Sequence, residues 1–263
     1  MKEKGLLKSI LRPGSSLLVL ASFSIGAGVA HYLGKAILWW PSLCACLLLL
    51  FLFWGSNLLR CYFDHPGSSF SILKKGHTRY QYLIRTQRSV FLTYALFSFT
   101  TAAVLMTLLL LNRQVDLTLL LLVFVIAILF LFDSTPPFFF QRKGYGELAE
   151  GVVISVLIPL LTLIVNNGEP HPILGMLTLP IFLILLAVDI AFSLRTYVED
   201  RDGGNPNLLN RLDWSKAMKL HNFLIPLAYL LIAGFGLVGL PWGFTWPQLL
   251  TLPIAIFAEI QMM

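Results

Sequence analysis

Apolar runs long enough to cross a bilayer recur along the whole chain. A helix needs about 20 residues to cross roughly 30 Å of hydrocarbon. By this measure the sequence predicts eight spans, over residues 15–33, 38–59, 89–111, 117–135, 148–166, 173–194, 220–239 and 244–262. We therefore expect an all-α fold, a polytopic transmembrane helical bundle of about eight spans that forms one domain over residues 1–263.

Composition and charge agree with this prediction. Hydrophobic residues make up 57% of the chain and charged residues 12%, with a mean hydropathy of +0.79, which lies far from the range of water-soluble domains. Of the 19 Lys and Arg residues, only Lys35 and Arg113 fall on one side of the predicted spans. Because positive charge is retained in cytoplasmic loops, we expect a multi-pass protein of the cell membrane with its N-terminus in the cytoplasm. The pI near 9.3 reports this asymmetry, so no nucleic-acid partner is expected.

A stripe of polar residues ends the second predicted span. Asn57, Arg60, Cys61 and Asp64 are spaced at i, i+3, i+4 and i+7, which places them on one helix face. Such a stripe is unfavourable against lipid, so it predicts a wet interior cavity. A capping cluster at the membrane interface is the alternative. The three cysteines of this span indicate close helix packing rather than a disulfide framework, with metal binding as the alternative.

The basic loop that follows this stripe contains Lys74, Lys75 and Arg79. Such a loop can bind phosphate oxygens above a cavity. It can equally contact anionic lipids.

The sixth predicted span runs into a loop rich in carboxylates and broken by glycine, residues 189–212. Asp189, Ser193, Thr196 and Asp200 are spaced at i, i+4, i+7 and i+11 on one helix face, with further acids beside Asp200. Carboxylates grouped in this way predict a divalent cation site. A neutral, hydrogen-bonded Asp189 between helices is the alternative. Spans three and four are predicted to form the wall of the bundle. Glu147 is a further acid at the start of the fifth span, where an interaction with the helix dipole is the alternative to a role in the site.

Several segments together resemble the UbiA-type intramembrane prenyltransferases, within them the branch that prenylates dihydroxynaphthoate in menaquinone synthesis. The resemblance covers nearly the whole chain, in the family's order and on the side predicted to be cytoplasmic. Its segments are Arg12-Pro13; residues 57–64, similar to N-L-x-N-D-Y-x-D; residues 134–137 with 144–147, similar to S-x-P-P…G-x-G-E; and residues 195–203 with 208–212, similar to R-D-x-E-x-D-R-x-x-G…T-L-x-x-R-L.

The chain departs from the family pattern at the acidic motifs. Arg60 and Cys61 stand where the family has asparagine and aspartate, and Thr196 and Val198 stand where it has aspartate and glutamate. Asn205 replaces a lysine often found in the following loop. The family typically has nine spans and this sequence predicts eight, so a closing helix is missing or the sequence is cut short.

The resemblance implies Mg²⁺-dependent transfer of a polyprenyl group from an isoprenoid diphosphate to a hydrophobic aromatic or lipid acceptor, within the bilayer and in a central cavity open to the cytoplasmic side. It implies that Asp64 and Asp200 are catalytic. The implied metal ligands are Asp64 and Asp200, with Asp202 or Glu199 as substitutes. Asp189 is added as a metal ligand from its own position, because it lies on the same helix stripe as Asp200. The implied substrate-binding residues are Asn57, Arg60, Lys74, Lys75, Arg79, Lys143, Arg195 and Arg201.

The lost acids leave a second function open. A catalytically impaired relative would bind isoprenoid diphosphate or lipid, or serve as a subunit of a membrane complex. A transporter is disfavoured, because the carboxylates gather at one face of the predicted bundle rather than at its midplane.

Overall fold

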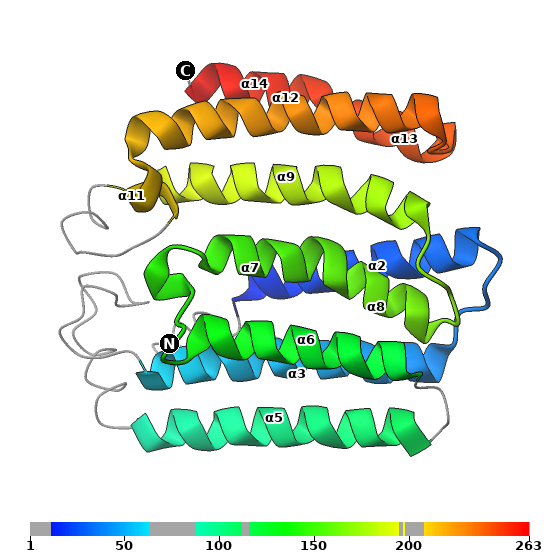
Figure 1. Ribbon diagram of the computed structural model, residues 1–263, viewed down its shortest axis with the longest axis vertical. Coiled ribbons are helices and arrows are strands. Elements are labelled where there is room, and N and C mark those ends of the chain that lie inside the picture. The colour runs from blue at the N-terminus through cyan, green and yellow to red at the C-terminus, as the bar shows by residue number, and fades with distance from the viewer. Residues whose placement is uncertain (1–11, 64–87, 112–115, 195–196, 198–207, 263) are drawn as a thin grey trace, which may run out of the picture.

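The computed structural model describes residues 12–63, 88–111, 116–194, 197 and 208–262 (Figure 1). Within this part of the chain every regular element is a helix. The elements are α2 (Pro13–Tyr32), α3 (Trp39–Phe63), α5 (Arg88–Leu111), α6 (Leu117–Ser134), η1 (Gln141–Lys143), α7 (Gly146–Val152), η2 (Val153–Leu157), α8 (Ile158–Val165), α9 (Pro172–Leu194), α11 (Leu208–Leu212), α12 (Trp214–Val238), α13 (Trp242–Leu249) and α14 (Leu252–Met262).

The predicted all-α membrane bundle is confirmed. Among the described residues, seven helical stretches are long and apolar enough to cross a bilayer, and α7, η2 and α8 together form one of them. Their bounds follow the predicted spans closely, except that α12 begins earlier, at Trp214. The predicted eighth span is not one continuous helix: it divides into α13 and α14. Pro253, in the first turn of α14, has no amide hydrogen with which to continue the hydrogen bonds of the preceding helix.

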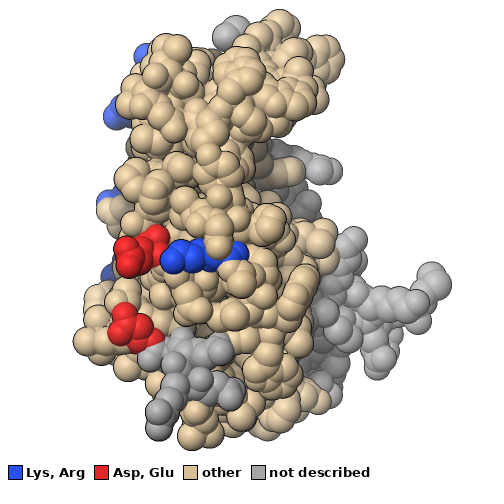
Figure 2. All heavy atoms as spheres, turned by 90° about the vertical axis from the view of Figure 1, so that its right-hand side faces the viewer, with Lys and Arg blue, Asp and Glu red and all other residues tan. Residues whose placement is uncertain are grey.

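The helices lie side by side in a stacked bundle, in the order α5, α3 with α6, α7 and α8 with α2, α9, α12, and finally α13 and α14 (Figure 1). The C-terminal ends of α3, α6 and α9 lie at the same end of the bundle as the N-terminal ends of α5, α7 and α12, on the left in Figure 1. Figure 2 views the opposite end, where few charged side chains interrupt the surface. The helix ends beside the segments that resemble the family motifs therefore lie at one end of the bundle.

A tight backbone contact sets α2 against the fifth span. A Cβ atom at Gly26 would lie 2.3 Å from the carbonyl oxygen of Pro159, so the two helices approach too closely for any side chain. One turn earlier, the hydroxyl of Ser22 donates to the carbonyl of Ile154 in η2. Small residues permit such packing between membrane helices, where lipid removes the hydrophobic drive for association. This contact places the start of α2 over α7.

We predict that Gly26→Ala destabilises the protein by about 1–3 kcal/mol, because the added methyl group meets backbone that has little room to move. Gly28→Ala is the matched control, since a Cβ at Gly28 of the same helix meets nothing within 4 Å. Denaturant titrations of both variants in detergent measure the difference. Equal stability of the two variants would contradict the contact.

Candidate functional site

A polar cavity of about 240 Å³ opens at the end of the bundle where the motif segments gather. Its walls come from the start of α2 and the ends of α3, α6 and α9, together with α7 and the turn before it. Four carboxylates and two guanidinium groups face it, so acids outnumber bases. The lining residues are Arg12, Arg60, Asp133, Gln141, Gly146, Glu147, Glu150, Asp189, Phe192 and Ser193.

One wall of the cavity is a buried ion pair between α3 and α6. Arg60 lies in the last turn of α3, and one of its terminal nitrogens donates to Oδ2 of Asp133, near the C-terminal end of α6. Only 7% and 6% of the two side chains are exposed. The pair keeps unused hydrogen-bonding atoms, since Nε of Arg60 and Oδ1 of Asp133 have no hydrogen-bond partner among the described residues. Buried polar atoms without partners are rare, so these two are positions for a water, an ion or a ligand.

A second ion pair, between Arg12 and Glu150, faces the same cavity. Arg12 directly precedes α2, and its terminal nitrogen lies 3.0 Å from Oε2 of Glu150 on α7. The guanidinium also lies over the ring of Phe53, 5.9 Å from its centre. The neighbouring Glu150 carboxylate raises the pKa of Arg12 above its ordinary value, so this arginine stays charged. The Arg-Pro segment is therefore part of the cavity wall.

The Gly-Tyr-Gly-Glu segment allows the chain to turn closely around Asp133. Gly144 has φ 74°, a conformation that favours glycine. A Cβ at Gly146 would lie 2.9 Å from Oδ1 of Asp133 and 2.8 Å from Cα of Gln141, so this position has no room for a side chain. Glu147 then faces the cavity at the start of α7.

Arg211 on α11 ties the segment after α9 to this turn. Its guanidinium stacks over Tyr145 at 4.2 Å and donates to the carbonyl of Lys143 at 2.9 Å. The structure thus brings together two segments that the sequence singled out separately, residues 144–147 and 208–212.

The structure brings some of the predicted site residues to this cavity. Arg60 and Asp189 line it, and Ser193 lies beside Asp189 as its helical spacing predicted. Asn57 is buried on α3 without lining the cavity, and Lys143 is exposed and donates to the carbonyl of Pro137 at 3.2 Å. The other predicted site residues lie outside the described residues: Asp64, Lys74, Lys75, Arg79, Arg195, Glu199, Asp200, Arg201 and Asp202.

Two expectations from the sequence are corrected. Cys61 does not share the cavity face with Arg60: it packs in an apolar cluster with Phe91 and Ala95 of α5. The two residues are adjacent in sequence and so point about 100° apart around α3. The fourth span is also more than wall, because its last turn carries Asp133.

Asp133, Glu150 and the role of Arg12 were missed by reasoning from the sequence. The sequence did contain a signal for Asp133, because an ionisable residue inside an apolar run is a functional candidate. Its position near the end of a span weakened that signal, since an acid there is also compatible with the membrane interface.

The cavity supplies oxygen ligands of the kind that a hard cation takes. Oδ1 of Asp133, Oε2 of Glu147 and Oε1 of Gln141 are buried and have no hydrogen-bond partner among the described residues. Within that same part of the chain, no three His, Cys, Asp or Glu side chains converge on one metal position. The donor set therefore fits Mg²⁺, which is commonly held by one or two carboxylates and completes its shell with water and substrate phosphates.

Comparisons with known proteins show the fold. No protein-family model and no curated protein matches the chain. Its structure is similar to that of a UbiA homolog from Archaeoglobus fulgidus bound to GPP and Mg²⁺, with a TM-score of 0.72 and 15% identity, over 96% of this chain and 85% of that chain. The same homolog bound to DMAPP and Mg²⁺ gives a TM-score of 0.71 and 16% identity, over 96% and 85%.

The chain has a UbiA-type fold. This confirms the fold that the scattered motifs predicted, although the identity of 15% is too low for the likeness to show more. The menaquinone branch stays a prediction. The chemical character of the cavity within this fold is set by this chain's own side chains, above all by the two arginine–carboxylate pairs.

We predict that the Arg60–Asp133 pair behaves as a coupled unit. Arg60→Met or Asp133→Leu alone leaves a buried charge without its partner and destabilises the protein by about 3–5 kcal/mol. The double variant replaces both charges by apolar groups and recovers most of that loss. A double-mutant cycle on unfolding free energies measures the coupling. Additive losses would show that the two side chains do not interact.

Proposed function

We propose that this chain transfers a prenyl group from an isoprenoid diphosphate to a hydrophobic acceptor within the membrane, with Mg²⁺ as cofactor. The observation that carries this proposal is the polar, acid-rich cavity at one end of a UbiA-type membrane bundle. A diphosphate with its counter-cation needs such a polar end, whereas a prenyl chain needs the apolar interior. The acceptor we propose is an aromatic quinone precursor or another lipid.

The roles in this transfer fall to residues of the cavity and of the segments that follow α3 and α9 in the sequence. Asp64 follows α3 directly, and Asp200 follows α9, so both belong to segments that leave helices whose ends line the cavity. Asp189 is already in the wall. The proposed metal ligands are Asp64, Asp189, Glu199, Asp200 and Asp202, and the proposed diphosphate contacts are Arg60, Lys74, Lys75, Arg79, Lys143, Arg195 and Arg201, with Asn57 in support.

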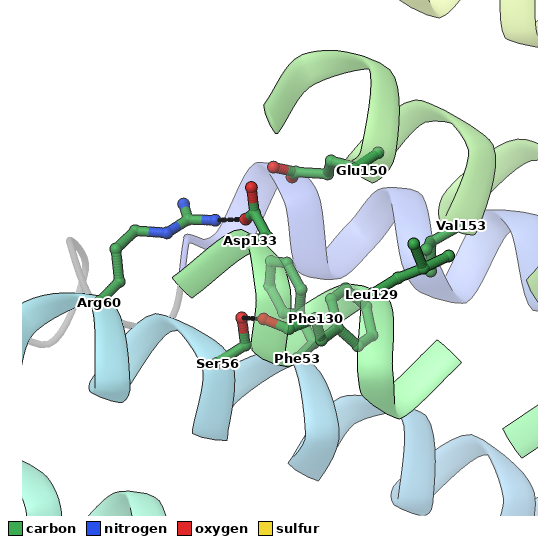
Figure 3. Close-up of a pocket in the computed structure, with 9 residues that line it drawn as sticks. Phe53, Ser56, Arg60, Leu129, Phe130, Asp133, Glu150 and Val153 are labelled. Carbon is green, nitrogen blue, oxygen red and sulfur yellow. Dashed lines mark hydrogen bonds and ion pairs between the residues drawn. The ribbon is translucent and has the colours of Figure 1, made fainter. Parts of the chain in front are cut away.

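The described side chains support binding and water exclusion. The open Nε–H of Arg60 can donate to a phosphate oxygen, since guanidinium and phosphate pair well. Inward of the ion pairs, Phe53, Leu129, Phe130 and Val153 line a space of about 10 Å³ (Figure 3). These apolar side chains limit the entry of water from that side of the polar cavity. When bound, Mg²⁺ would neutralise charge on the departing diphosphate.

We also propose the membrane placement that the charge asymmetry indicates. In the sequence, the basic segments follow or precede helix ends that lie at the cavity end, and the described surface of the opposite end carries few charges (Figure 2). By the positive-inside rule, the N-terminus lies on the cytoplasmic side of the cell membrane and the cavity opens towards that side.

One observation favours a second candidate, a relative that binds isoprenoid diphosphate without transferring the prenyl group. At the first acidic motif, Arg60 is held by Asp133, and Cys61 packs among apolar residues where the family has an aspartate. That helix therefore contributes fewer metal ligands than the family pattern.

Membranes containing the protein distinguish the two candidates. With labelled geranylgeranyl diphosphate, Mg²⁺ and a panel of aromatic and lipid acceptors, we expect diphosphate release that a chelator abolishes. Donor binding without metal-dependent release would leave the binding function and overturn the transferase.

We predict that Asp64→Asn and Asp200→Asn each lower turnover by about 100-fold, the scale for losing one group that stabilises charge developing in a reaction. Glu169→Gln is the matched control, because Glu169 is exposed and precedes α9, at the opposite end of the bundle. Rates of diphosphate release at saturating donor measure the effect. Full activity in both aspartate variants would refute the assigned roles.

A further inference from the structure

The short helix α11 belongs to the wall of the polar cavity that α9 forms. Leu208 and Leu209 of α11 lie in one buried apolar cluster with Ala187 and Ile190 of α9. The same part of α9 carries Asp189, which lines the cavity. Figure 1 shows α11 at the end of α9, beside the start of α12. A contact made by α11 is therefore a contact made by the α9 wall.

Two reciprocal contacts join α11 to the start of α7, on another wall of the cavity. Arg211 donates to the carbonyl oxygen of Lys143 at 2.9 Å, and its Cζ lies 4.2 Å from the centre of the Tyr145 ring. In the other direction, the carboxylate of Glu147 accepts from the backbone amide of Leu208. A base of α11 thus holds the backbone before α7, and an acid of α7 holds the backbone of α11. We call these contacts the α11 clamp.

The segment that the α11 clamp holds is in contact with the acids of the cavity. A Cβ at Gly146 would lie 2.9 Å from Oδ1 of Asp133, and Glu147 follows directly and lines the cavity. Oε2 of Glu147 is buried and has no hydrogen-bond partner among the described residues. One oxygen of this carboxylate is therefore fixed on α11, and the other is left for the contents of the cavity.

The geometry of Arg211 suits a positioning role better than a stabilising one. Arg211 is exposed and the Tyr145 ring is 40% exposed, and contacts of exposed cations contribute little to the free energy of unfolding. Their geometry is specific, however, because a planar guanidinium stacks on a ring and donates in its own plane, which an ammonium group does not. A weak but specific contact thus joins two walls of one cavity.

We propose that Arg211 is a positioning residue that sets the separation of the α7 wall from the α9 wall of the polar cavity. It does not line the cavity, and it acts through Lys143 and Tyr145 on Glu147. Its effect on a diphosphate donor rests on the proposed function, in which the donor and its cation lie between these walls. Its effect on the cavity itself does not rest on that function.

Thiol labelling in the cavity tests the α11 clamp without any donor. Ser193→Cys places a thiol on the α9 wall, and the full chain in phosphatidylcholine nanodiscs is treated with a charged methanethiosulfonate reagent. We expect Arg211→Gln to raise the labelling rate of this thiol severalfold, because the two walls are no longer joined. The unaltered protein, with its three native cysteines, gives the background rate.

Lys216→Gln in the same Ser193→Cys protein is the matched control. Lys216 is an exposed base of α12 in the turn that follows α11, so the change removes the same charge and leaves the clamp in place. We expect its labelling rate to equal that of Ser193→Cys alone. Equal rates in the Arg211→Gln and Lys216→Gln proteins would overturn the proposal.

Donor kinetics separate positioning from a merely structural role. With geranylgeranyl diphosphate we expect Arg211→Gln to raise the donor KM and the Mg²⁺ concentration for half-maximal rate by about tenfold, with a smaller change in kcat. Arg211→Lys keeps the charge without the planar stack, so it recovers only part of the KM. Tyr145→Leu removes the ring and is expected to reproduce part of the KM change.

Each outcome decides between distinct conclusions. If the unaltered protein turns over no donor, the transferase fails, and the labelling rates alone decide the proposal. If Arg211→Gln labels faster yet has the donor KM of Lys216→Gln, Arg211 does not position the donor site and the proposal fails there. A thermal unfolding midpoint well below that of Lys216→Gln would make Arg211 a structural residue and would overturn its positioning role.

Discussion

A charge held within a membrane bundle needs a partner, and in this protein that constraint shapes one whole end of the molecule. Arg60 and Asp133 join α3 to α6, and Arg12 and Glu150 join the start of α2 to α7. The Arg60–Asp133 pair is almost fully buried, so neither of its charges would be well solvated alone. Each of the two pairs holds one helix end against another. The polar cavity exists because these pairs, with Glu147 and Asp189, face one another.

Close backbone packing elsewhere makes these pairs geometrically possible. Gly26 lets α2 lie directly against Pro159, and this contact keeps the start of α2 within reach of Glu150. Near the opposite end of the bundle, Asn166 accepts from the amide of Leu38 and from the hydroxyl of Ser42, which joins the end of α8 to the start of α3. Both devices rely on small or amide side chains, since hydrocarbon surroundings offer no hydrophobic drive between helices.

The groups that face the cavity bear on function more than the motifs do. A fold of this type is a scaffold, and activity depends on the groups that it brings together. Arg60 and Cys61 stand where the resembling pattern has asparagine and aspartate, and the structure supplies Asp133 and Glu150 from α6 and α7, which no motif marked. The described acids that line the cavity therefore come from α6, α7 and α9.

The sequence alone predicted the bounds of seven of its eight expected spans, because the bilayer sets the length of an apolar helix and the apolar run can be read from the sequence. It also predicted that Asp189 and Ser193 share a face, since helical spacing is local. Only the tertiary structure decided which charges meet. The partners of the two pairs are separated by 73 and 138 residues, and their meeting depends on how each helix is rotated against its neighbours. That rotation is set by packing contacts such as Gly26 on Pro159 and Cys61 on α5, which no spacing within one helix encodes.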